Sequence, residues 1–375
     1  MVTQPKRRSL ISHLERIPDP RSKRVSHALT DILAISLSAT LSGAESFDAV
    51  HQFAVDQEEW LRTFLPLSNG IPSADTIWRV HQLLNPKVFT ACVTDWLAAA
   101  CEATGFPHIA IDGKSVRAAK RETFSGCLHL VTAWATENGI VLGQEAVADK
   151  SNEIPAIPEL LKTLDVAGAL VTIDAAGTQV EIAQQIQSQK GDYLLPVKGN
   201  QPGLLAACEA NFAHAQATDF SEAEVTEHES VERTHGRIDE RYTLAIANPK
   251  RLPAEWSAVK VIVQVNRERE VKGKRASTTT YYVCSRRLAA KTLAKPIRRH
   301  WGIENELHWV LDVTFHEDGN RTRDQNAGAN LGLIRRTALS LLKRVPGKNS
   351  VKTKRMQAAW SKQFRLTALQ GLLGN

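Results

Sequence analysis

Two short apolar runs, each followed at once by an aspartate, set the strongest limits on how this chain can fold. Residues 108–111 precede Asp112, and residues 170–173 precede Asp174. Runs of this length and apolar content are typical of buried strands. A carboxylate just past such a strand lies at the rim of a sheet, where partial desolvation strengthens its attraction for a cation. The two runs therefore predict a sheet with acidic side chains at its edge.

A third acid, Glu304, lies in a segment whose apolar residues Trp301, Leu307 and Trp309 have helical spacing. Three carboxylates from two strands and a helix can converge on an oxygen-rich site for hard divalent cations. Two such ions about 4 Å apart would hold the attacking and leaving oxygens of a phosphodiester. The donor set selects Mg²⁺ or Mn²⁺ over zinc, which favours softer ligands.

Composition excludes several classes of protein. The chain of 375 residues is long enough for two or three domains, and no apolar run approaches the roughly 20 residues of a membrane-spanning helix. The five cysteines are scattered without a CxxC pair. This pattern argues against a zinc site or a disulfide framework and favours a reducing cytoplasm.

Positive charge is concentrated at the two ends of the chain. The net charge is +7, yet residues 1–30 hold seven Lys/Arg against two acids, and residues 335–375 hold ten Lys/Arg and no acid. Basic segments of this kind attract phosphate backbones and make binding depend on salt. The alternative is a solvated surface tail, which charge runs often are. The absence of acids over residues 335–375 favours nucleic acid.

The first hundred residues have helical spacing. Residues 31–41 form one helix, residues 47–65 continue the pattern, and Ser73 is a good N-cap for a helix that carries Trp78 and Arg79. The last two helices could form a helix-turn-helix that faces DNA. Packing of Trp78 in the core is the favoured alternative, because no turn signature is visible.

From about residue 106 the pattern changes to strands. Strands are expected at 108–111, 128–135, 140–148, 170–173 and 192–197, with helices at 157–164 and 180–189. Residues 136–139 (Thr-Glu-Asn-Gly) predict a hairpin. This order matches the ribonuclease-H-like fold, a mixed sheet flanked by helices. A β-rich insertion at about 220–290 precedes the helix with Glu304.

Eight blocks of the chain resemble the insertion-sequence DDE transposases, in the branch that includes the H-repeat-associated proteins of Rhs elements. The blocks are IPDPR (17–21), GIPS (70–73), AIDGK (110–114), KSNEIPAIP (150–158), VTIDA (171–175), KGNQ (198–201), HGR (235–237) and HWGIEN (300–305). Each block alone is weak evidence for the family, but eight blocks in the same order identify it specifically. The resemblance extends from about residue 10 to 342.

The resemblance implies an α/β protein with a ribonuclease-H-like mixed sheet core. A helical N-terminal domain would occupy residues 1–104, the catalytic domain with its β-rich insertion residues 105–343, and a basic tail residues 344–375. By matching position, Asp112, Asp174 and Glu304 would be the catalytic acids and the ligands of Mg²⁺ or Mn²⁺, with two ions expected. Asp312, eight residues after Glu304, is the alternative third acid.

The chain departs from the wider insertion-sequence pattern Y-x2-R-x3-E-x6-K. The four positions are here Ile297, His300, Glu304 and Leu311. The acid is kept while the Tyr, Arg and Lys are not, so the DNA contact of that Lys is not carried over. His300 and His308 flank Glu304, and each could be a general base or could pack against the neighbouring tryptophans.

Six residues are candidates for DNA contacts. They are Arg79 in the N-terminal module, Lys114 and Arg117 after Asp112, and Lys198, Asn200 and Gln201 after the strand at 192–197. Lys114 and Arg117 would flank a bound phosphate, or could be solvated surface charges. Residues 198–201 lie at the rim of the sheet, where ligands gather. His235 and Arg237 could contact DNA or form a structural turn.

The expected activity is that of a DNA transposase, a metal-dependent endonuclease that cuts strands at element ends and transfers the 3′-hydroxyl into target DNA. Its partners would be double-stranded DNA of the terminal repeats and of the target, with a homodimer assembled on DNA and no membrane. The expected location is the bacterial cytoplasm, at the nucleoid. The alternatives are an inactive DNA-binding remnant and a standalone metal-dependent nuclease.

Overall fold

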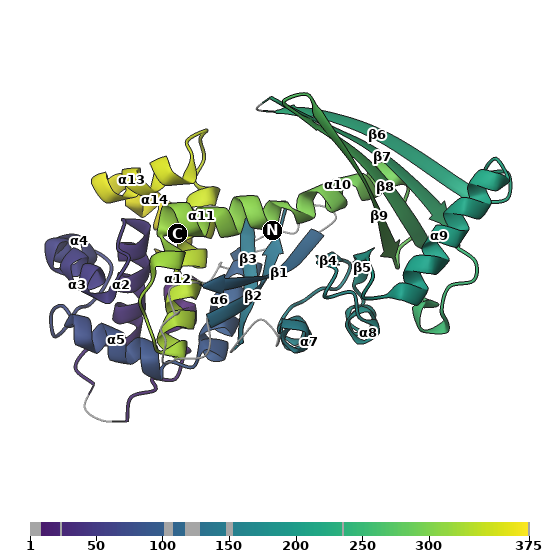
Figure 1. Ribbon diagram of the computed structural model, residues 1–375. Helices are drawn as coiled ribbons and strands as arrows, with labels where there is room; N and C mark the ends of the chain where they lie inside the picture. The colour runs from purple at the N-terminus through teal and green to yellow at the C-terminus, as the bar shows by residue number, and fades with distance from the viewer. Residues whose placement is uncertain are drawn as a thin grey trace, which may run out of the picture. The chain divides into compact units, whose positions relative to one another are not determined.

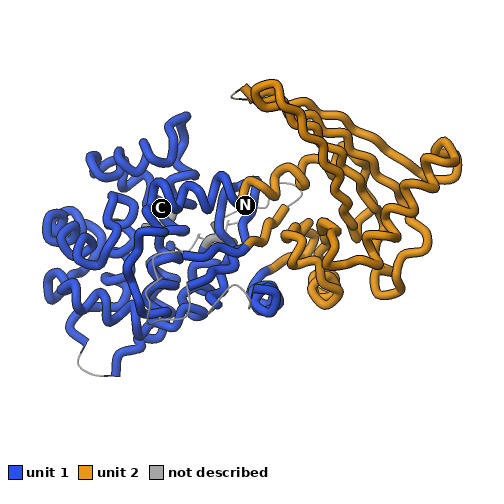
Figure 2. Tube along the Cα trace, viewed as in Figure 1, with its two compact units in different colours: residues 1–104, 113–164, 304–375 blue, residues 105–112, 165–303 orange. Residues whose placement is uncertain are grey.

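The computed structural model describes residues 9–22, 25–100, 108–116, 128–147, 153–234 and 236–373. The chain divides into two compact units (Figure 2). Unit 1 consists of Met1–Thr104, Gly113–Leu164 and Glu304–Asn375, and unit 2 of Gly105–Asp112 and Asp165–Ile303. These units follow other boundaries than the expected domains 1–104, 105–343 and 344–375.

Unit 1 contains the N-terminal helices, a β-hairpin and the C-terminal helices (Figure 1). Its helices are α1 (Leu10–Leu14), α2 (Leu29–Leu41), α3 (Phe47–Asp56), α4 (Glu58–Leu61), α5 (Ala74–Leu83), α6 (Pro86–Ala100), α7 (Glu153–Lys162), α11 (Trp309–Phe315), α12 (Gln325–Arg344), α13 (Val351–Trp360) and α14 (Lys362–Leu373). Ser46, Ser73 and Ser350 begin α3, α5 and α13, each accepting a backbone N–H three residues on at 3.2 Å.

Helix α12 is the central element of unit 1. Every residue from Ala327 to Leu342 is buried. The reason is that α12 contacts helices α2, α5, α6, α13 and α14 as well as the hairpin, so none of its sides faces water. Gly328 and Gly332 permit close packing on the hairpin, because a Cβ at these positions would lie only 3.2 Å from Leu128 and 3.3 Å from Leu130.

The hairpin of unit 1 consists of β2 (Leu128–Ala135) and β3 (Ile140–Val147), which pair antiparallel. Gly139 ends the turn at φ +65°, a conformation that favours glycine. The hairpin predicted at residues 136–139 is therefore confirmed.

Unit 2 is built on one mixed sheet. Its strands are β1 (His108–Val116, which continues into unit 1), β4 (Leu170–Ile173), β5 (Asp192–Val197), β6 (Glu224–Thr234), β7 (Arg237–Ala247), β8 (Val261–Val271) and β9 (Lys274–Cys284). Strands β1, β4 and β5 are parallel, and the remaining pairs are antiparallel in the order β5-β9-β8-β7-β6. Its helices are α8 (Val180–Ser188), α9 (Pro202–Ala217) and α10 (Ala290–His300), with a 3₁₀ turn at Ala254–Trp256.

The mixed α/β fold with a ribonuclease-H-like core, a helical N-terminal region and a β-rich insertion is confirmed by this strand order, β3-β2-β1-β4-β5, with the insertion strands following. Strand β6 was missed by the sequence pattern. Its residues are Glu- and Thr-rich, and none of them is fully buried, so it lacks the apolar alternation that marks a strand. The 16-residue helix α9 was also not predicted.

The basic tail expected at residues 344–375 is largely helical and partly buried. Residues 351–373 form α13 and α14, and Lys354, Arg355 and Arg365 are buried there. Arg365 lies over the rings of Phe53 and Trp60, at 5.0 and 4.5 Å from their centroids. Among the described helices, none is both long and apolar enough to cross a membrane.

Candidate active site

Two predicted acids in unit 2 lie just past the point where the pairing of β1 with β4 ends, although β1 itself continues to Val116 rather than ending at the expected residue 111. Strands β1 and β4 are parallel, and their last paired residues are Ile111 and Ile173. Asp112 and Asp174 are the next residues along the two strands. Because neighbouring strands are about 4.8 Å apart and residues in register share a face, the two carboxylates follow the same edge of the sheet. Both residues are partly buried, as expected for a rim position.

A tight turn fixes the residue after β4. The Asp174 side chain accepts a hydrogen bond from the backbone N–H of Gly177 at 3.1 Å. Thr178 then donates its hydroxyl to the carbonyl of Pro196 in β5 at 2.7 Å. The loop that carries Asp174 is thus tied to the neighbouring strand, which limits the freedom of the carboxylate.

Two predicted DNA contacts instead hold this loop. The Asn200 amide donates to the carbonyl of Ala175 at 2.8 Å, and the Gln201 amide donates to the carbonyl of Thr178 at 2.9 Å. These N–H groups are used inside the protein. Lys198, in the same loop, is exposed. Of the three residues predicted here, Lys198 and Asn200 are exposed, although the Asn200 amide already donates to Ala175. DNA contact by any of the three stays a prediction.

Beneath Asp174, a buried histidine and a half-buried one share one hydroxyl. Thr172 Oγ1 lies 2.9 Å from His108 Nε2 and 3.0 Å from His300 Nδ1, so the end of α10 is anchored to β4. Burial lowers the pKa of His300 to about 4 and the pKa of His108 to about 3, the latter with help from nearby cations. Of the two roles considered for His300, the packing role fits, because an imidazole with this pKa is a weak base at neutral pH.

The third predicted acid belongs to unit 1. Glu304 lies in a six-residue π-helix, Ile303–His308, rather than in regular α-helix. The Glu304 side chain is exposed while Ile303 and Leu307 are buried. Short π-helical turns occur frequently at functional sites. His308 is buried, and burial lowers its pKa to about 3, so it is not poised as a base either.

The predicted metal ligands are not assembled into one cluster in the described residues. Within the described ranges, no three His, Cys, Asp or Glu side chains are grouped closely enough to hold an ion. The structure brings together Asp112 and Asp174 by strand register, and Glu304 is assigned by its matching position in the sequence.

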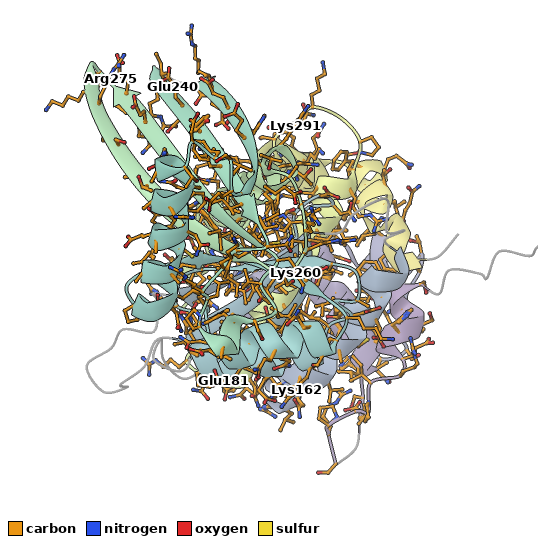
Figure 3. The ribbon with its side chains drawn as sticks, turned by 90° about the vertical axis from the view of Figure 1, so that its right-hand side faces the viewer. Lys162, Glu181, Glu240, Lys260, Arg275 and Lys291 are labelled. Atoms are coloured by element: carbon orange, nitrogen blue, oxygen red, sulfur yellow. The ribbon has the colours of Figure 1, made fainter. Side chains whose placement is uncertain are left out.

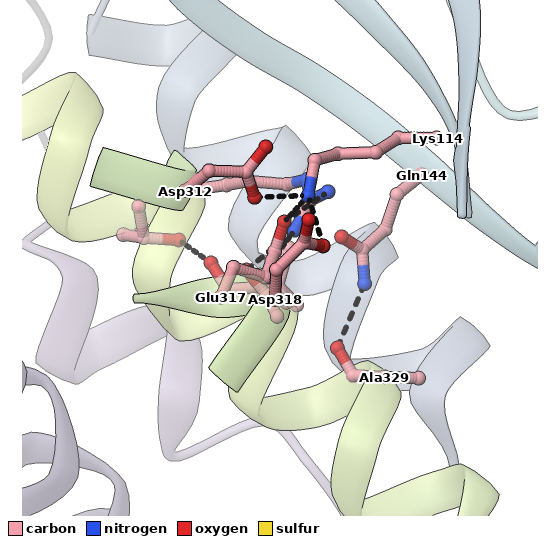
Figure 4. A network of polar contacts seen from close by, with 10 residues as sticks. Lys114, Gln144, Asp312, Glu317, Asp318 and Ala329 are labelled. Atoms are coloured by element: carbon pink, nitrogen blue, oxygen red, sulfur yellow. Dashed lines mark hydrogen bonds and ion pairs between the residues drawn. The ribbon is translucent and has the colours of Figure 1, made fainter. Parts of the chain in front are cut away.

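Lys114, a predicted phosphate contact, is the centre of a buried charge network in unit 1 (Figure 4). Its ammonium lies 2.5 Å from Asp312, 3.2 Å from Glu317 and 3.3 Å from Asp318. Only 8% of the side chain is exposed. Burial alone would lower the pKa of Lys114, but Glu317 and Asp312 outweigh burial and raise it. A lysine enclosed by three carboxylates has no free face for a phosphate, so the structure argues against the DNA role.

Asp312, the alternative third acid, belongs to the same charge network. Asp312 binds Lys114, and burial raises the pKa of Asp312 despite that partner. Glu317 is fully enclosed and pairs with Arg336 at 2.6 Å. Burial would raise the pKa of Glu317, yet Arg336 and Lys114 lower it to about 2. Asp312 is therefore a member of a structural network, which favours Glu304 as the acid of the site.

A pair of residues beside Gly113 was missed by the sequence interpretation. His129 Nδ1 lies 3.0 Å from the Ser115 hydroxyl, and its Nε2 lies 3.4 Å from the Glu153 carboxylate. A Cβ on Gly113 would lie 2.2 Å from that carboxylate and 2.5 Å from His129 Nε2. A larger residue after Asp112 would have to displace both of these side chains. The KSNEIPAIP block contains Glu153, but nothing in its spacing indicates this contact.

The N-terminal candidates lie on the surface of unit 1. Arg79 is exposed and pairs with Asp75 one turn earlier on α5. Trp78 was expected in the core, but 39% of it is exposed, and it lines an open cavity with residues 45–48 and 319–324. Residues 62–73 separate α4 from α5, too long a connection for a helix-turn-helix. Arg117 and His235 lie outside the described residues.

Two family models match the chain. The model described as "DDE_Tnp_1-associated" matches residues 11–97, and the model described as "Transposase DDE domain" matches residues 103–341.

Among known proteins, the chain is similar to "Putative transposase YncI" of Escherichia coli O157:H7, with 38% identity over 94% of this chain and 92% of that protein. It is also similar to "H repeat-associated putative transposase YhhI" of Escherichia coli K12, with 35% identity over 97% of this chain and 98% of that protein. A shorter relative, "Inactive transposase YbfQ", matches 20% of this chain at 36% identity. A solved piggyBac transposase synaptic complex with hairpin DNA aligns with a TM-score of 0.43 and 10% identity, covering 97% of this chain and 77% of that one.

Proposed function

The chain belongs to the family of transposases with a DDE domain, and we propose that it cuts DNA strands at the ends of a mobile element and joins the freed 3′-hydroxyl to target DNA. The observation that carries the proposal is the register of β1 and β4, which sets Asp112 and Asp174 at one sheet edge. Two carboxylates so placed would repel each other unless a cation lay between them.

The donor set fits a hard divalent cation. Asp112 and Asp174 offer oxygen ligands from two strands that cannot separate without breaking the sheet, and the exposed Glu304 offers a third. We assign these three residues to the cation, Mg²⁺ or Mn²⁺, and propose two ions, because this reaction class commonly uses a pair of metals. When bound, the ions would stabilise the charge on the phosphodiester and favour ionised water.

The protein's own residues would supply positioning. The tight turn at Gly177 and the amides of Asn200 and Gln201 hold the loop after β4, so that Asp174 keeps its place as substrate enters. The Thr172 hydroxyl and His300 fix the end of α10 four residues before Glu304. Catalysis of phosphoryl transfer depends mainly on such preorganisation.

We propose double-stranded DNA, both element ends and target, as the partner, with two copies of the chain assembled on it in the bacterial cytoplasm. Two relatives that cover almost the whole chain are named transposases, which supports this partner. The rival function is an inactive DNA-binding remnant, since one short relative is named inactive. The presence of all three acids favours the active enzyme.

The test is strand cleavage on a duplex that carries the inverted repeats flanking the coding sequence, with Mg²⁺ or Mn²⁺. Asp174→Asn is expected to lower cleavage more than about 100-fold, since loss of even an outer partner of a metal ligand costs 10–100-fold. DNA binding should stay within a few-fold. Glu181→Gln, a surface acid on α8 of the same unit, is the matched control. Normal cleavage by Asp174→Asn would remove this residue from the site.

A further inference from the structure

The four strands of the insertion extend beyond the helices that cover their base. At the base, Ala290, Leu293 and Ile297 of α10 pack against one face of the sheet. Phe212 of α9 contacts Tyr281 on the other face, with ring centroids 5.9 Å apart. Past this base the strands continue in unit 2 as a four-stranded ribbon (Figure 1). We call the outer part, residues 229–234, 237–242, 266–271 and 274–279, the arm tip.

Strand register sorts the side chains of the arm tip into two faces. Residues opposite one another in paired strands share a face, and neighbours along a strand alternate. One face therefore combines the rows Ser230–Arg241–Arg267–Thr278, Glu232–Asp239–Arg269–Ala276 and Thr234–Arg237–Val271–Lys274. The opposite face combines Glu229–Tyr242–Asn266–Thr279, Val231–Glu240–Glu268–Ser277 and Arg233–Ile238–Glu270–Arg275.

The two faces carry opposite charge. The first, which we call the basic face, has five cations (Arg237, Arg241, Arg267, Arg269, Lys274) and two carboxylates, Glu232 and Asp239, a net charge of +3. The second, the acidic face, has four carboxylates and two cations, a net charge of −2. Figure 3 shows two residues of the acidic face, Glu240 and Arg275, toward the free end of the strands. Charge is thus segregated across a single layer of sheet.

The carboxylates of the basic face are outnumbered by their partners. Asp239 lies 2.6 Å from Arg267, 3.5 Å from Arg269 and 3.9 Å from Arg241. One carboxylate cannot neutralise three guanidinium groups, so positive charge is left over.

The second carboxylate, Glu232, is shared in the same way. It lies 3.3 Å from Arg241 and 3.0 Å from Arg298, which reaches it from α10. Burial lowers the pKa of Arg241, and although Glu232 opposes this shift, Arg298 and Arg267 add to it. The cations of this face therefore crowd one another, a state that an added anion would relieve.

The unneutralised cations are open to solvent. The exposed side-chain fractions are 35% for Arg267, 40% for Arg269 and 46% for Arg298. Arg237 and Lys274, at the end of the same face, are exposed as well. Arginine guanidinium groups bind phosphate oxygens through paired N–H donors, which makes such a surface suited to a phosphate backbone.

We propose that the basic face of the arm tip binds the phosphate backbone of double-stranded DNA, and that the acidic face stays turned away from it. The choice of DNA as the polyanion rests on the proposed function. The argument for docking is charge complementarity, because adjacent rows of the basic face hold more cations than carboxylates. The rows of this face form no apolar patch that would suit a folded protein partner. Contacts of this kind position DNA and do not read its sequence.

The test compares two double variants that lose the same charge from opposite faces. Arg237→Gln/Lys274→Gln removes two cations from the basic face, where both flank Val271. Arg233→Gln/Arg275→Gln removes two from the acidic face, where they flank Ile238 and Glu270 in the neighbouring row. All four residues are exposed ends of the same ribbon, so thermal unfolding should be the same for both variants.

The measurement is the affinity of the full chain for a linear duplex without element ends, over a range of salt and with EDTA. We expect the basic-face variant to flatten the slope of log affinity against log salt by about 1.8 units, at about 0.9 per lost phosphate contact, and the acidic-face variant to leave it unchanged. Equal flattening in both variants would mean that net charge alone acts and would overturn the proposal. So would an unchanged slope in both, or a change of oligomeric state without a change of slope, which would indicate that the face meets the acidic face of a second copy.

This assay needs neither cleavage nor element ends. A chain that cuts DNA with Asp112 and Asp174 but shows no difference between the two variants would leave the proposed function intact and refute the docking surface. A chain that never cuts DNA but shows the difference between the two variants would support the docking surface and refute the proposed function.

Discussion

The C-terminal segment and the arm tip are both rich in arginine, but they use its charge in opposite ways. Residues 335–375 hold ten Lys/Arg and no acid, yet five of these cations are buried. The buried five are Arg335, Arg336, Lys354, Arg355 and Arg365. The basic face of the arm tip has five cations, and acids alternate with them along the sequence. Four of the five, all but Arg241, are well exposed, and the cations exceed the carboxylates of the face in number.

The difference teaches that charge density along the sequence does not measure accessible charge. In the C-terminal segment, arginines satisfy the carbonyl ends of other elements: Arg355 donates to Thr40 at 3.2 Å, and Arg365 donates to Ala358 at 2.9 Å. An alternating sequence of Arg and Glu looks neutral, but in a strand it places the two signs on different faces. The acid-free segment is therefore mainly structural, and the mixed segment is the better candidate for a polyanion.

The largest expected effect is on folding. Arg336→Met would leave Glu317 buried with one cation fewer, and removal of one partner of a buried pair costs about 3–5 kcal/mol. Chemical denaturation should show this loss in the free energy of unfolding. Lys352→Met, an exposed cation of the same segment, is the control and should change it by less than about 0.5 kcal/mol. Similar losses of unfolding free energy in both variants would mean that buried and exposed cations of this segment do not differ in their effect on stability.

A somewhat smaller effect is expected from pH. The pKa of Glu317 is about 2 in the fold against 4.5 in the unfolded chain, so its ionised form stabilises the fold above pH 4.5. That contribution, about 3 kcal/mol at 1.36 kcal/mol per unit of pKa, should be lost as the pH falls from 4.5 toward 2. Glu317→Gln should lack this part of the acid dependence in urea titrations at several pH values. An identical acid slope in wild type and variant would show that Glu317 is not held ionised.

Arg365 offers an intermediate case. Its guanidinium covers Phe53 and Trp60 and donates to Gln57 at 3.0 Å. Arg365→Met keeps the aliphatic packing but loses the charge, so we expect a cost of about 2 kcal/mol from lost cation–π and hydrogen-bond contacts. Thermal unfolding measures it, with Lys362→Met on the same helix as control. A strong effect on DNA affinity in the folded variant would instead give this helix a binding role.

The smallest effect is expected at the arm tip. Arg275 pairs with Glu270 at 2.8 Å, but 73% of its side chain is exposed. Exposed ion pairs are screened by solvent and contribute little, so Arg275→Gln should barely change the free energy of unfolding. Urea denaturation checks this, with Lys272→Gln in the adjacent turn as reference. A loss comparable with that of Arg336→Met would mean that arm charges serve folding, as the C-terminal ones do.

Much of the fold could be predicted from sequence because the apolar signal is local. The strands at 128–135, 170–173 and 192–197 match the structure to the residue, since each is a short and largely apolar run. Strand β6 has no such signal, because neither of its faces is fully buried. The burial of α12 on every side also escaped the pattern, since it depends on helices from both ends of the chain.

The acids of the candidate site could be predicted from the sequence, but most contacts of the residues around them could not. Asp112 and Asp174 stand out because an acid directly after an apolar strand is conspicuous. The enclosure of Lys114 by Asp312, Glu317 and Asp318 depends on contacts about 200 residues apart, which no local pattern reports. The loop contacts of Asn200 and Gln201 are of the same kind, since they join the ends of two neighbouring strands.

The central claim is that Asp112 and Asp174 form one cation site, and Mn²⁺ binding to the DNA-free protein tests it most directly. Titration calorimetry of the full chain should show binding that Asp112→Asn and Asp174→Asn each weaken by at least about tenfold. Glu181→Gln should bind Mn²⁺ as the unaltered chain does. If both aspartate variants bind Mn²⁺ as tightly as the unaltered chain, Asp112 and Asp174 do not share a cation, and the central claim is wrong.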